Sequence, residues 1–318
     1  MEPFIAQTDK RWFDFLSSRA RDGVVDEVNF WSPQSTDPLK KMNEGEPVFF
    51  RLKKPHFAIA GYGYFAHFRV LDLETAWDLF EWKNGDPDRL GFLDRIGAFR
   101  KKDLLNPSTP RAPLGCTILR SAVFWSSERW IPWGETRGWA ANIVRGKTEE
   151  NSGHAHFLLN TMADAAPEEL VASSFVPLEV DERRFVRSVQ AAREGQGTFR
   201  TRLIDAYKGR CAITGEHTEP VLDAAHIQPY LGPRSNHLQN GLTLTKEFHT
   251  LFDRGYVTVT PDLVVRVSSR LRSDWKNGRR YYPYDGQALV QVPDRPANRP
   301  SPEALAWHNR RVFLGTGS

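Results

Sequence analysis

The sequence predicts an α+β protein with two domains. Its 318 residues are more than one hydrophobic core usually fills. Segments typical of helices and segments typical of strands are mixed in both halves of the chain. The charge also changes along the chain: residues 183–318 carry 21 lysines and arginines against 12 acidic residues, whereas residues 1–182 carry 22 against 27. We therefore expect an N-terminal domain over residues 1–162, a linker over 163–182 and a C-terminal domain over 183–318.

The N-terminal half is expected to begin with a helix and to continue as a sheet with two further helices. Trp12, Phe15 and Leu16 have the spacing of one helix face. Runs rich in β-branched and aromatic residues predict strands at 25–31, 47–52, 57–68, 115–119 and 122–125. Apolar residues at helical spacing predict helices at 73–82 and 90–100, and 141–148 is expected to form one last element. His154 and His156 alternate as residues of a strand do.

The linker predicted at 163–182 is rich in alanine, proline and acidic residues. Residues 183–207 are basic and have a mostly helical pattern. Strands at 256–259 and 263–267 are expected to form a hairpin, and 303–313 a short helix. A basic domain of this kind is the usual electrostatic footprint of nucleic-acid binding, because lysine and arginine displace condensed counterions from phosphates.

Composition also excludes several classes of protein. No apolar run approaches the roughly 20 residues that a membrane span needs, and the N-terminus lacks the basic and apolar regions of a signal peptide. We therefore expect a cytoplasmic protein with no membrane partner. Cys116 and Cys211 are the only cysteines and lie far apart, which excludes a disulfide scaffold and a four-cysteine zinc site.

The most informative segment lies between residues 211 and 253. It contains Cys-Ala-Ile-Thr-Gly, then Ala-Ala-His-Ile, Asn-Gly-Leu and His-Thr-Leu-Phe-Asp. His226, Asn240 and His249 stand 14 and then 9 positions apart, with a short hairpin and the start of a helix between them. This order resembles the HNH nuclease motif, in which a two-strand hairpin packs on one helix around a divalent metal.

The resemblance implies a catalytic role for each of the three residues. His226 would be the general base, because the unperturbed pKa of a histidine lies near physiological pH. Asn240 would brace the loop between the strands and keep His226 oriented, and His249 would bind the metal. Asp253 lies one helical turn after His249, so it would be a second ligand or would hold the other nitrogen of that ring. The expected cofactor is Mg²⁺, Mn²⁺ or another divalent cation.

One position departs from the common HNH pattern. Many HNH nucleases have an aspartate or histidine ligand immediately before the catalytic histidine, and here that residue is Ala225. The Ala-Ala-His-Ile variant is common in one branch of bacterial HNH proteins, usually with an acid three residues before the histidine. That acid is Asp223, which we carry over as a third metal-site residue. Relatives in this branch often have zinc-binding cysteine pairs, but only Cys211 is present here, so no structural zinc is expected.

Residues 2–150 carry a second resemblance, which rests on Val28-Asn29-Phe30-Trp31-Ser32-Pro33 and on the segments 45–52, 61–65 and 76–85. These segments resemble the EVE-type PUA-like domains that are fused to HNH nucleases in bacteria. Their fold is a small curved β-barrel with flanking helices, related to YTH domains. Members of this group recognise a modified base by flipping it into an aromatic-walled pocket. The residues that we expect in the pocket are Trp31, Ser32, Phe65 and Trp82.

The two resemblances predict a modification-dependent, type IV-like restriction endonuclease. Its N-terminal domain would recognise 5-methylcytosine or 5-hydroxymethylcytosine in double-stranded DNA, and its HNH (ββα-metal) domain would hydrolyse phosphodiester bonds nearby. Because each HNH site cuts one strand, we expect a homodimer, and we expect a role in defence against phage. Two alternatives stay open: an HNH nuclease that reads unmodified sequence or RNA, and a non-enzymatic reader of modified nucleic acid.

Overall fold

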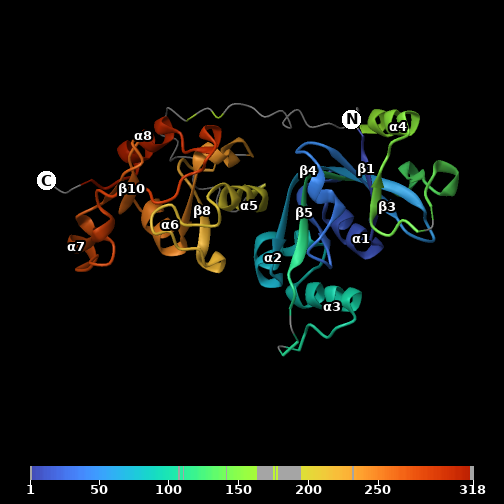
Figure 1. Ribbon diagram of the computed structural model, residues 1–318, viewed down its shortest axis with the longest axis horizontal. Helices are drawn as coiled ribbons and strands as arrows, with labels where there is room; N and C mark the ends of the chain where they lie inside the picture. The colour runs from blue at the N-terminus through green and yellow to red at the C-terminus, as the bar shows by residue number, and fades with distance from the viewer. Residues whose placement is uncertain are drawn as a thin grey trace. The chain divides into compact units, whose positions relative to one another are not determined.

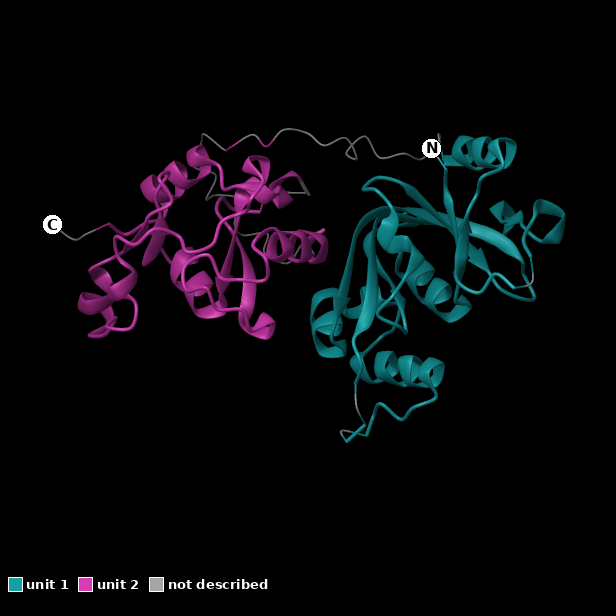
Figure 2. Cartoon of the chain, in the orientation of Figure 1, with its two compact units in different colours: residues 1–172 teal, residues 173–318 magenta. Residues whose placement is uncertain are grey.

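The computed structural model describes residues 2–106, 108–109, 111–140, 142–162, 175, 177, 195–230 and 233–315. The chain forms two compact units, residues 1–172 and residues 173–318 (Figure 2). The division falls inside the predicted linker, most of which lies outside the described residues, as does the predicted basic segment up to residue 194. The exact domain boundaries therefore stay predictions, while the mixed α+β class is confirmed.

The N-terminal unit is built on one seven-stranded sheet (Figure 1). Its hydrogen-bonded path runs through β2 (Val24–Ser32), β5 (Leu114–Phe124), β4 (Ala58–Leu71), β3 (Pro47–Leu52), β1 (Phe4–Thr8) and β7 (Gly146–Thr148), and β6 (Ile131–Pro132) pairs with β4. Strands β1 and β3 are parallel and the other pairs are antiparallel. Shifts of register along β4 bend that strand, so the sheet curves around its core. The path leaves β2 and β7 as its two edges.

The α-helices that accompany the sheet in the described residues are α1 (Lys10–Arg19), α2 (Leu73–Phe80), α3 (Arg89–Arg100) and α4 (Ser152–Met162). The first three each begin after an aspartate whose side chain accepts a hydrogen bond from the first turn, which satisfies a backbone N–H that the helix leaves unpaired. The predicted helices and strands of this half are present, but residues 115–119 and 122–125 form one strand rather than two. Ser121, with φ of 48°, lies where the pairing of this strand with β4 shifts register.

Strand β1 and helix α4 were not predicted, and the strand interpretation of His154 and His156 is wrong. Both histidines lie on α4, which buries Ala155, Leu158 and Met162. These three residues have the spacing of one helix face, and Asn151 caps the first turn by accepting from the backbone N–H of His154 at 3.1 Å. Both signals are therefore present in the sequence, and the helical period outweighs a two-residue alternation.

The C-terminal unit places a hairpin between helices (Figure 1). Strands β8 (Leu222–His226) and β9 (Gly241–Thr245) pair antiparallel, and α5 (Gln196–Ala206) and α6 (Lys246–Asp253) pack against both. A second hairpin, β10 (Val257–Val259) with β11 (Val265–Val267), and the helices α7 (Arg270–Trp275) and α8 (Pro302–Arg311) complete the unit. The largest fully buried side chains of this core come from α5, from the residue directly after it and from α6: Phe199, Tyr207, Phe248 and Phe252.

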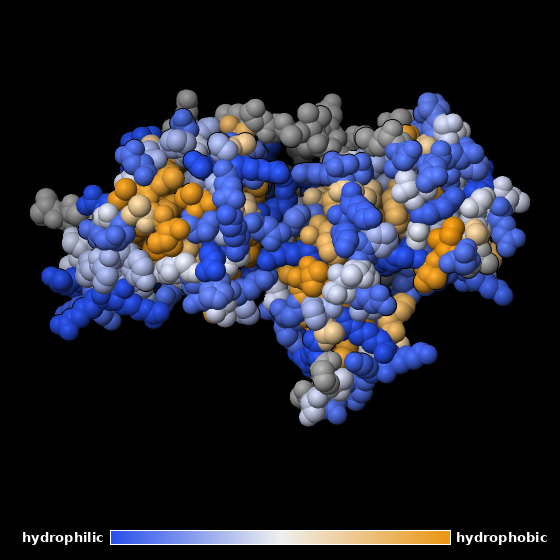
Figure 3. All heavy atoms as spheres, viewed as in Figure 1, coloured by the Kyte–Doolittle hydropathy of each residue, from blue (hydrophilic) through white to orange (hydrophobic). Residues whose placement is uncertain are grey.

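Each unit has a hydrophobic core of its own. Figure 3 shows a mainly hydrophilic surface on which apolar side chains emerge in separate patches over both units. Among the described residues, the helices are too short or too polar for any of them to span a lipid bilayer.

Candidate active site and ligand pocket

The three residues of the predicted nuclease motif come from one hairpin and the helix that follows it. His226 ends β8 and pairs in register with Gly241, Asn240 directly precedes β9, and His249 lies in the middle of α6. A side chain at Gly241 would place its Cβ only 2.7 Å from Leu203 and 2.8 Å from Phe199. The glycine after Asn240 therefore lets α5 pack closely over the start of β9.

His226 is held by a ring contact and a side-chain hydrogen bond. Its half-buried ring stacks on Phe199 of α5, with ring centroids 4.3 Å apart and an interplanar angle of 14°. Its Nε2 atom lies 3.0 Å from Oδ1 of Asn236. Because an amide oxygen only accepts hydrogen bonds, this contact places the hydrogen of the neutral ring on Nε2.

Asn240 ties together the two ends of the loop between β8 and β9. Its side chain is buried, and its Oδ1 accepts a hydrogen bond of 2.9 Å from the backbone N–H of Gln228. Its Nδ2 donates to the carbonyl oxygens of Gln228, at 3.2 Å, and of Ser235, at 3.0 Å. These bonds fix the backbone two residues after His226. The geometry is that of a brace, and its importance for catalysis stays a prediction.

His249 lies between the two predicted metal-site carboxylates. Its Nδ1 is 2.9 Å from Oδ2 of Asp223 on β8, and its Nε2 is 3.4 Å from Oδ2 of Asp253, one turn later on α6. Burial raises the pKa of Asp223, but the hydrogen bond from His249, the charge of His249 and that of Arg200 lower it, and the net pKa lies below the ordinary value. Asp223 is therefore ionised at neutral pH.

The donor set of this cluster, one imidazole and two carboxylates, fits a divalent cation such as Mg²⁺, Mn²⁺ or Zn²⁺. The Nε2–Oδ2 separation of 3.4 Å between His249 and Asp253 is short enough for both atoms to reach one ion at about 2.1 Å. Asp223 instead contacts the Nδ1 side of the ring, where a carboxylate orients a metal-binding histidine. Within the described ranges, no group of three or more His, Cys, Asp and Glu side chains is placed to hold a metal ion, so His249 and Asp253 are the pair that the geometry offers to one ion.

The C-terminal end of α6 is anchored by a buried histidine from α8. The His308 ring stacks on Phe252 at 3.7 Å, its Nε2 donates to the Phe252 carbonyl at 3.2 Å, and its Nδ1 is 2.7 Å from the Thr258 hydroxyl. Burial lowers the pKa of His308 to about 3, although the carbonyl contact raises it. The neutral ring is thus the form that the fold accommodates.

This anchor predicts a pH-dependent loss of stability. Because the folded pKa of His308 lies below the unfolded value of about 6.5, its contribution is complete above pH 6.5 and falls as the pH drops toward 3. We expect about 1.4 kcal/mol of lost unfolding free energy per pH unit. Urea unfolding between pH 7.5 and 5 should therefore show a shallower pH dependence in His308→Gln than in the wild type. His217→Gln, which alters an exposed histidine, should keep the wild-type slope. Equal slopes in all three proteins would contradict this assignment.

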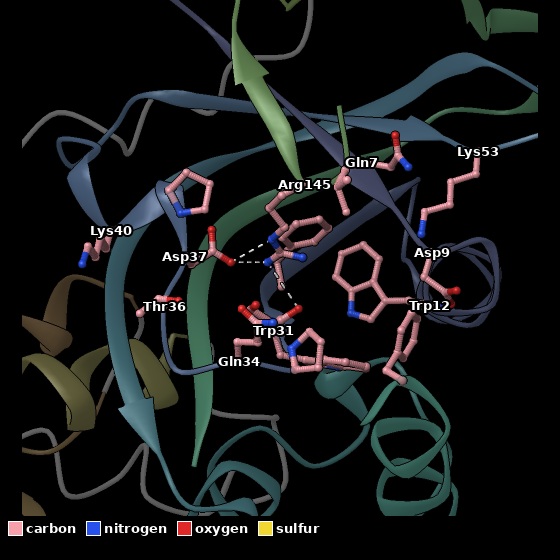
Figure 4. Close-up of a pocket in the computed structure, with 16 residues that line it drawn as sticks. Gln7, Asp9, Trp12, Trp31, Gln34, Thr36, Asp37, Lys40, Lys53 and Arg145 are labelled. Atoms are coloured by element: carbon pink, nitrogen blue, oxygen red, sulfur yellow. Dashed lines mark hydrogen bonds and ion pairs between the residues drawn. The ribbon is translucent and has the colours of Figure 1, made fainter. Parts of the chain in front are cut away.

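The N-terminal unit contains a cavity of about 570 Å³ beside the gap between the two edge strands (Figure 4). Residues of β1, β2, α1 and α3, of the segment after β2 and of the segment before β7 contribute to its walls. The aromatic residues that line it are Trp12, Phe30, Trp31 and Phe99. Its volume is within the range of pockets that hold small ligands, roughly 300–1,000 Å³.

An ion pair crosses the gap between the edge strands inside this cavity. Arg145, just before β7, donates from both Nε and Nη2 to Oδ2 of Asp37, which follows β2, and the Nε contact is 2.8 Å (Figure 4). Nη2 also lies 3.4 Å from the carbonyl oxygen of Trp31. The two edges therefore meet through side chains where no backbone ladder joins them.

Of the four predicted pocket residues, two line the cavity and two do not. Trp31 and Ser32 line the cavity. Phe65 is buried in the core beneath the sheet, and Trp82 packs against the same core, so neither lines it. We leave Phe65 and Trp82 out of the proposed pocket. Sequence reasoning missed Asp37 and Arg145, which are 108 positions apart and carry no shared local pattern.

The hairpin, the helix and the side chains around His226 define an HNH nuclease site. The sequence matches the HNH endonuclease family over residues 211–260, so the C-terminal unit contains an HNH endonuclease domain. No curated protein matches the chain significantly.

Two solved structures are similar to the chain at low identity. The ASCH protein of Zymomonas mobilis shares 12% identity over 38% of this chain and 73% of its own, with a TM-score of 0.25. The modification-dependent restriction endonuclease TagI shares 14% identity over 90% of this chain and 75% of its own, with a TM-score of 0.27. The assignment of the nuclease domain rests on the family match and on the hairpin–helix geometry.

Proposed function

We propose that this protein is a modification-dependent restriction endonuclease that binds modified cytosine in double-stranded DNA and cuts the DNA with its HNH site. The modified base would be 5-methylcytosine or 5-hydroxymethylcytosine. The observation that carries the proposal is the combination, in one chain, of an HNH domain with a second unit that has an aromatic pocket of ligand size. A nuclease that needed only phosphate contacts would have no use for such a pocket.

The pocket has the properties that a flipped base requires. Extrusion from the duplex costs a few kcal/mol, and stacking on aromatic rings returns about 1–3 kcal/mol per base. Trp31 and the half-exposed Phe99 supply such rings, and the exposed Lys40 and Lys53 lie on opposite sides of the cavity in Figure 4, where they could contact phosphates. A methyl group adds only about 0.8 kcal/mol by burial, so a close apolar wall must provide the discrimination.

In the proposed cleavage step, His226 takes a proton from the water that attacks the phosphodiester. Asn240 keeps the histidine in place through the backbone of Gln228. His249 and Asp253 would hold the divalent ion, and Asp223 would orient His249 or join the ligands. When bound, the ion supplies stabilisation of negative charge on the phosphate and the leaving oxygen.

A double-strand break needs two such sites, because each HNH site cuts one strand. We therefore propose that the protein acts as a homodimer, formed alone or on DNA. Sedimentation velocity of the full chain with and without a modified duplex would test this. A protein that stays monomeric in both conditions and only nicks DNA would contradict it.

Digestion of matched plasmids tests the proposed function. Unmodified, cytosine-methylated and cytosine-hydroxymethylated plasmids would be incubated with the full chain in Mg²⁺ or Mn²⁺. We expect cleavage of the modified plasmids only. Phe99→Ala should slow that cleavage about tenfold by removing a stacking surface, whereas Leu90→Ala, which alters an exposed residue of the same helix outside the cavity, should not. Equal cutting of all plasmids would leave the nuclease and eliminate the modified-base role.

A further inference from the structure

We propose that Arg145 is the residue that reads the base in the pocket, by donating a hydrogen bond from Nη1 to the N3 acceptor of a flipped cytosine. This inference rests on the proposed function and adds to it the chemical basis of base choice. Arg145 lines the cavity, and about a quarter of its side chain is exposed, so part of its guanidinium group can reach a ligand.

The guanidinium group is fixed in place before any ligand enters. Its Cζ atom lies 4.9 Å from the centre of the Phe30 ring, so one face is covered by an aromatic residue. Its Nε and Nη2 groups are committed to Asp37 and, for Nη2, also to the Trp31 carbonyl. A donor that is already oriented loses little conformational entropy on binding.

Asp37 is a positioning residue rather than a base contact. Its side chain is completely buried, and its Oδ1 accepts a hydrogen bond of 3.0 Å from the backbone N–H of Leu39. Its Oδ2 accepts both bonds from Arg145. With no exposed surface, the carboxylate acts through the arginine that it holds.

The remaining nitrogen of Arg145 has donors without acceptors. Within the part of the chain that the structure describes, neither N–H group of Nη1 makes a hydrogen bond to the protein. Arginine has no acceptor atom and stays protonated, so this end of the group can satisfy itself only with acceptors. A base that enters the pocket can supply such an acceptor in place of water.

Donors at a fixed position select among bases by the pattern of their edges. Cytosine presents N3 as an acceptor in the middle of its Watson–Crick edge. Thymine carries a hydrogen on N3, so its N3–H would face the N–H of Arg145 Nη1 and neither donor would find an acceptor there. This contact does not involve C5, so it selects cytosine while a different wall of the pocket senses the C5 substituent. Guanine offers adjacent acceptors only at O6 and N7 and is a competing ligand in the test.

The first experiment compares two duplexes that differ in one base, at the edge that Arg145 is proposed to read. Full-length protein in EDTA, which prevents cutting, is titrated with labelled duplexes that carry 5-methylcytosine or thymine opposite the same guanine. Both bases have the same C5 methyl group. Because the mismatched thymine is easier to flip, tighter binding of 5-methylcytosine cannot come from the cost of extrusion. We expect at least tenfold tighter binding of the 5-methylcytosine duplex.

Variants separate base reading from a purely structural role of the ion pair. Arg145→Lys keeps the charge near Asp37 and Arg145→Met removes it, and both lose the Nη1 donor that the planar guanidinium group holds in place. We expect the ratio of the two dissociation constants to fall to within about twofold of unity in both. Arg137→Met removes an arginine that stacks on Trp133 and Phe157 outside the cavity, and should keep the wild-type ratio. Circular dichroism would confirm that each variant is folded.

The outcomes distinguish this inference from the function on which it rests. If Arg145 only closes the gap between the edge strands, its replacement will weaken the binding of both duplexes equally and leave the ratio of their dissociation constants unchanged. That result would overturn the inference. The same conclusion would follow if the wild type bound thymine as tightly as 5-methylcytosine, or preferred an unpaired guanine. Failure to prefer 5-methylcytosine over unmodified cytosine would instead overturn the proposed function itself.

Discussion

Replacing His226 with alanine is expected to lower the rate of cleavage of modified plasmid by about 10²–10⁴-fold, which is the usual contribution of a positioned general base. The ring stacks on Phe199, and its Nε2 lies 3.0 Å from Oδ1 of Asn236, so two contacts hold the proposed base in position. Time courses of nicking at saturating Mg²⁺ measure the effect.

Two controls make this result specific. His217→Ala removes an exposed histidine of the same unit and should cleave at the wild-type rate. Binding of His226→Ala to modified DNA in EDTA should equal that of the wild type, because the proposed base pocket lies in the other unit. A His226→Ala protein that is folded, binds DNA and cuts within threefold of the wild-type rate would refute the role of His226 as the base.

His249→Ala is expected to abolish binding of the divalent ion and to reduce cleavage by about 10²–10³-fold, the scale of losing one strong electrostatic contribution to the transition state. His249 contacts both Asp223 and Asp253. Without His249, Asp223 on β8 and Asp253 on α6 lose the side chain that both of them contact. Calorimetric titration with Mn²⁺ measures the ion directly, without dependence on activity.

The two carboxylates should respond differently in the same titration. Asp253→Asn removes the oxygen that shares the Nε2 side of His249, and should weaken Mn²⁺ binding more than Asp223→Asn does. A residue that orients a metal-binding histidine typically changes affinity by about 10–100-fold. Asp262→Asn, in the exposed turn between β10 and β11, is the control for lost charge. Unchanged Mn²⁺ affinity in His249→Ala would place the ion elsewhere.

The nuclease site could be predicted in detail because it is local. His226, Asn240 and His249 belong to one hairpin and the next helix, so short-range turn and helix geometry brings their elements together. The Asn-Gly step at the start of β9 also marks the close approach of α5. What the sequence could not indicate was which carboxylate faces which nitrogen of His249. That depends on how α6 packs across β8, and packing depends on the whole core.

The pocket could be predicted only in part. The segment with Trp31 and Ser32 is recognisable at the end of β2, and both residues line the cavity. Phe65 and Trp82 were equally aromatic, but the sheet turns the first into the core and packs the second against it. An alternating pattern shows that neighbouring residues point to opposite faces, and it does not show which face becomes the wall of a cavity.

By itself, the sequence determined the α+β class, most helices and strands, the HNH motif and the chemistry available to its residues. The tertiary structure alone decided that Arg145 and Asp37 form an ion pair and that this pair lies inside a cavity. The physical reason is the range of the interactions. Turns, caps and helix faces are set by residues a few positions apart, whereas the edges of a curved sheet meet only after every intervening strand has found its register.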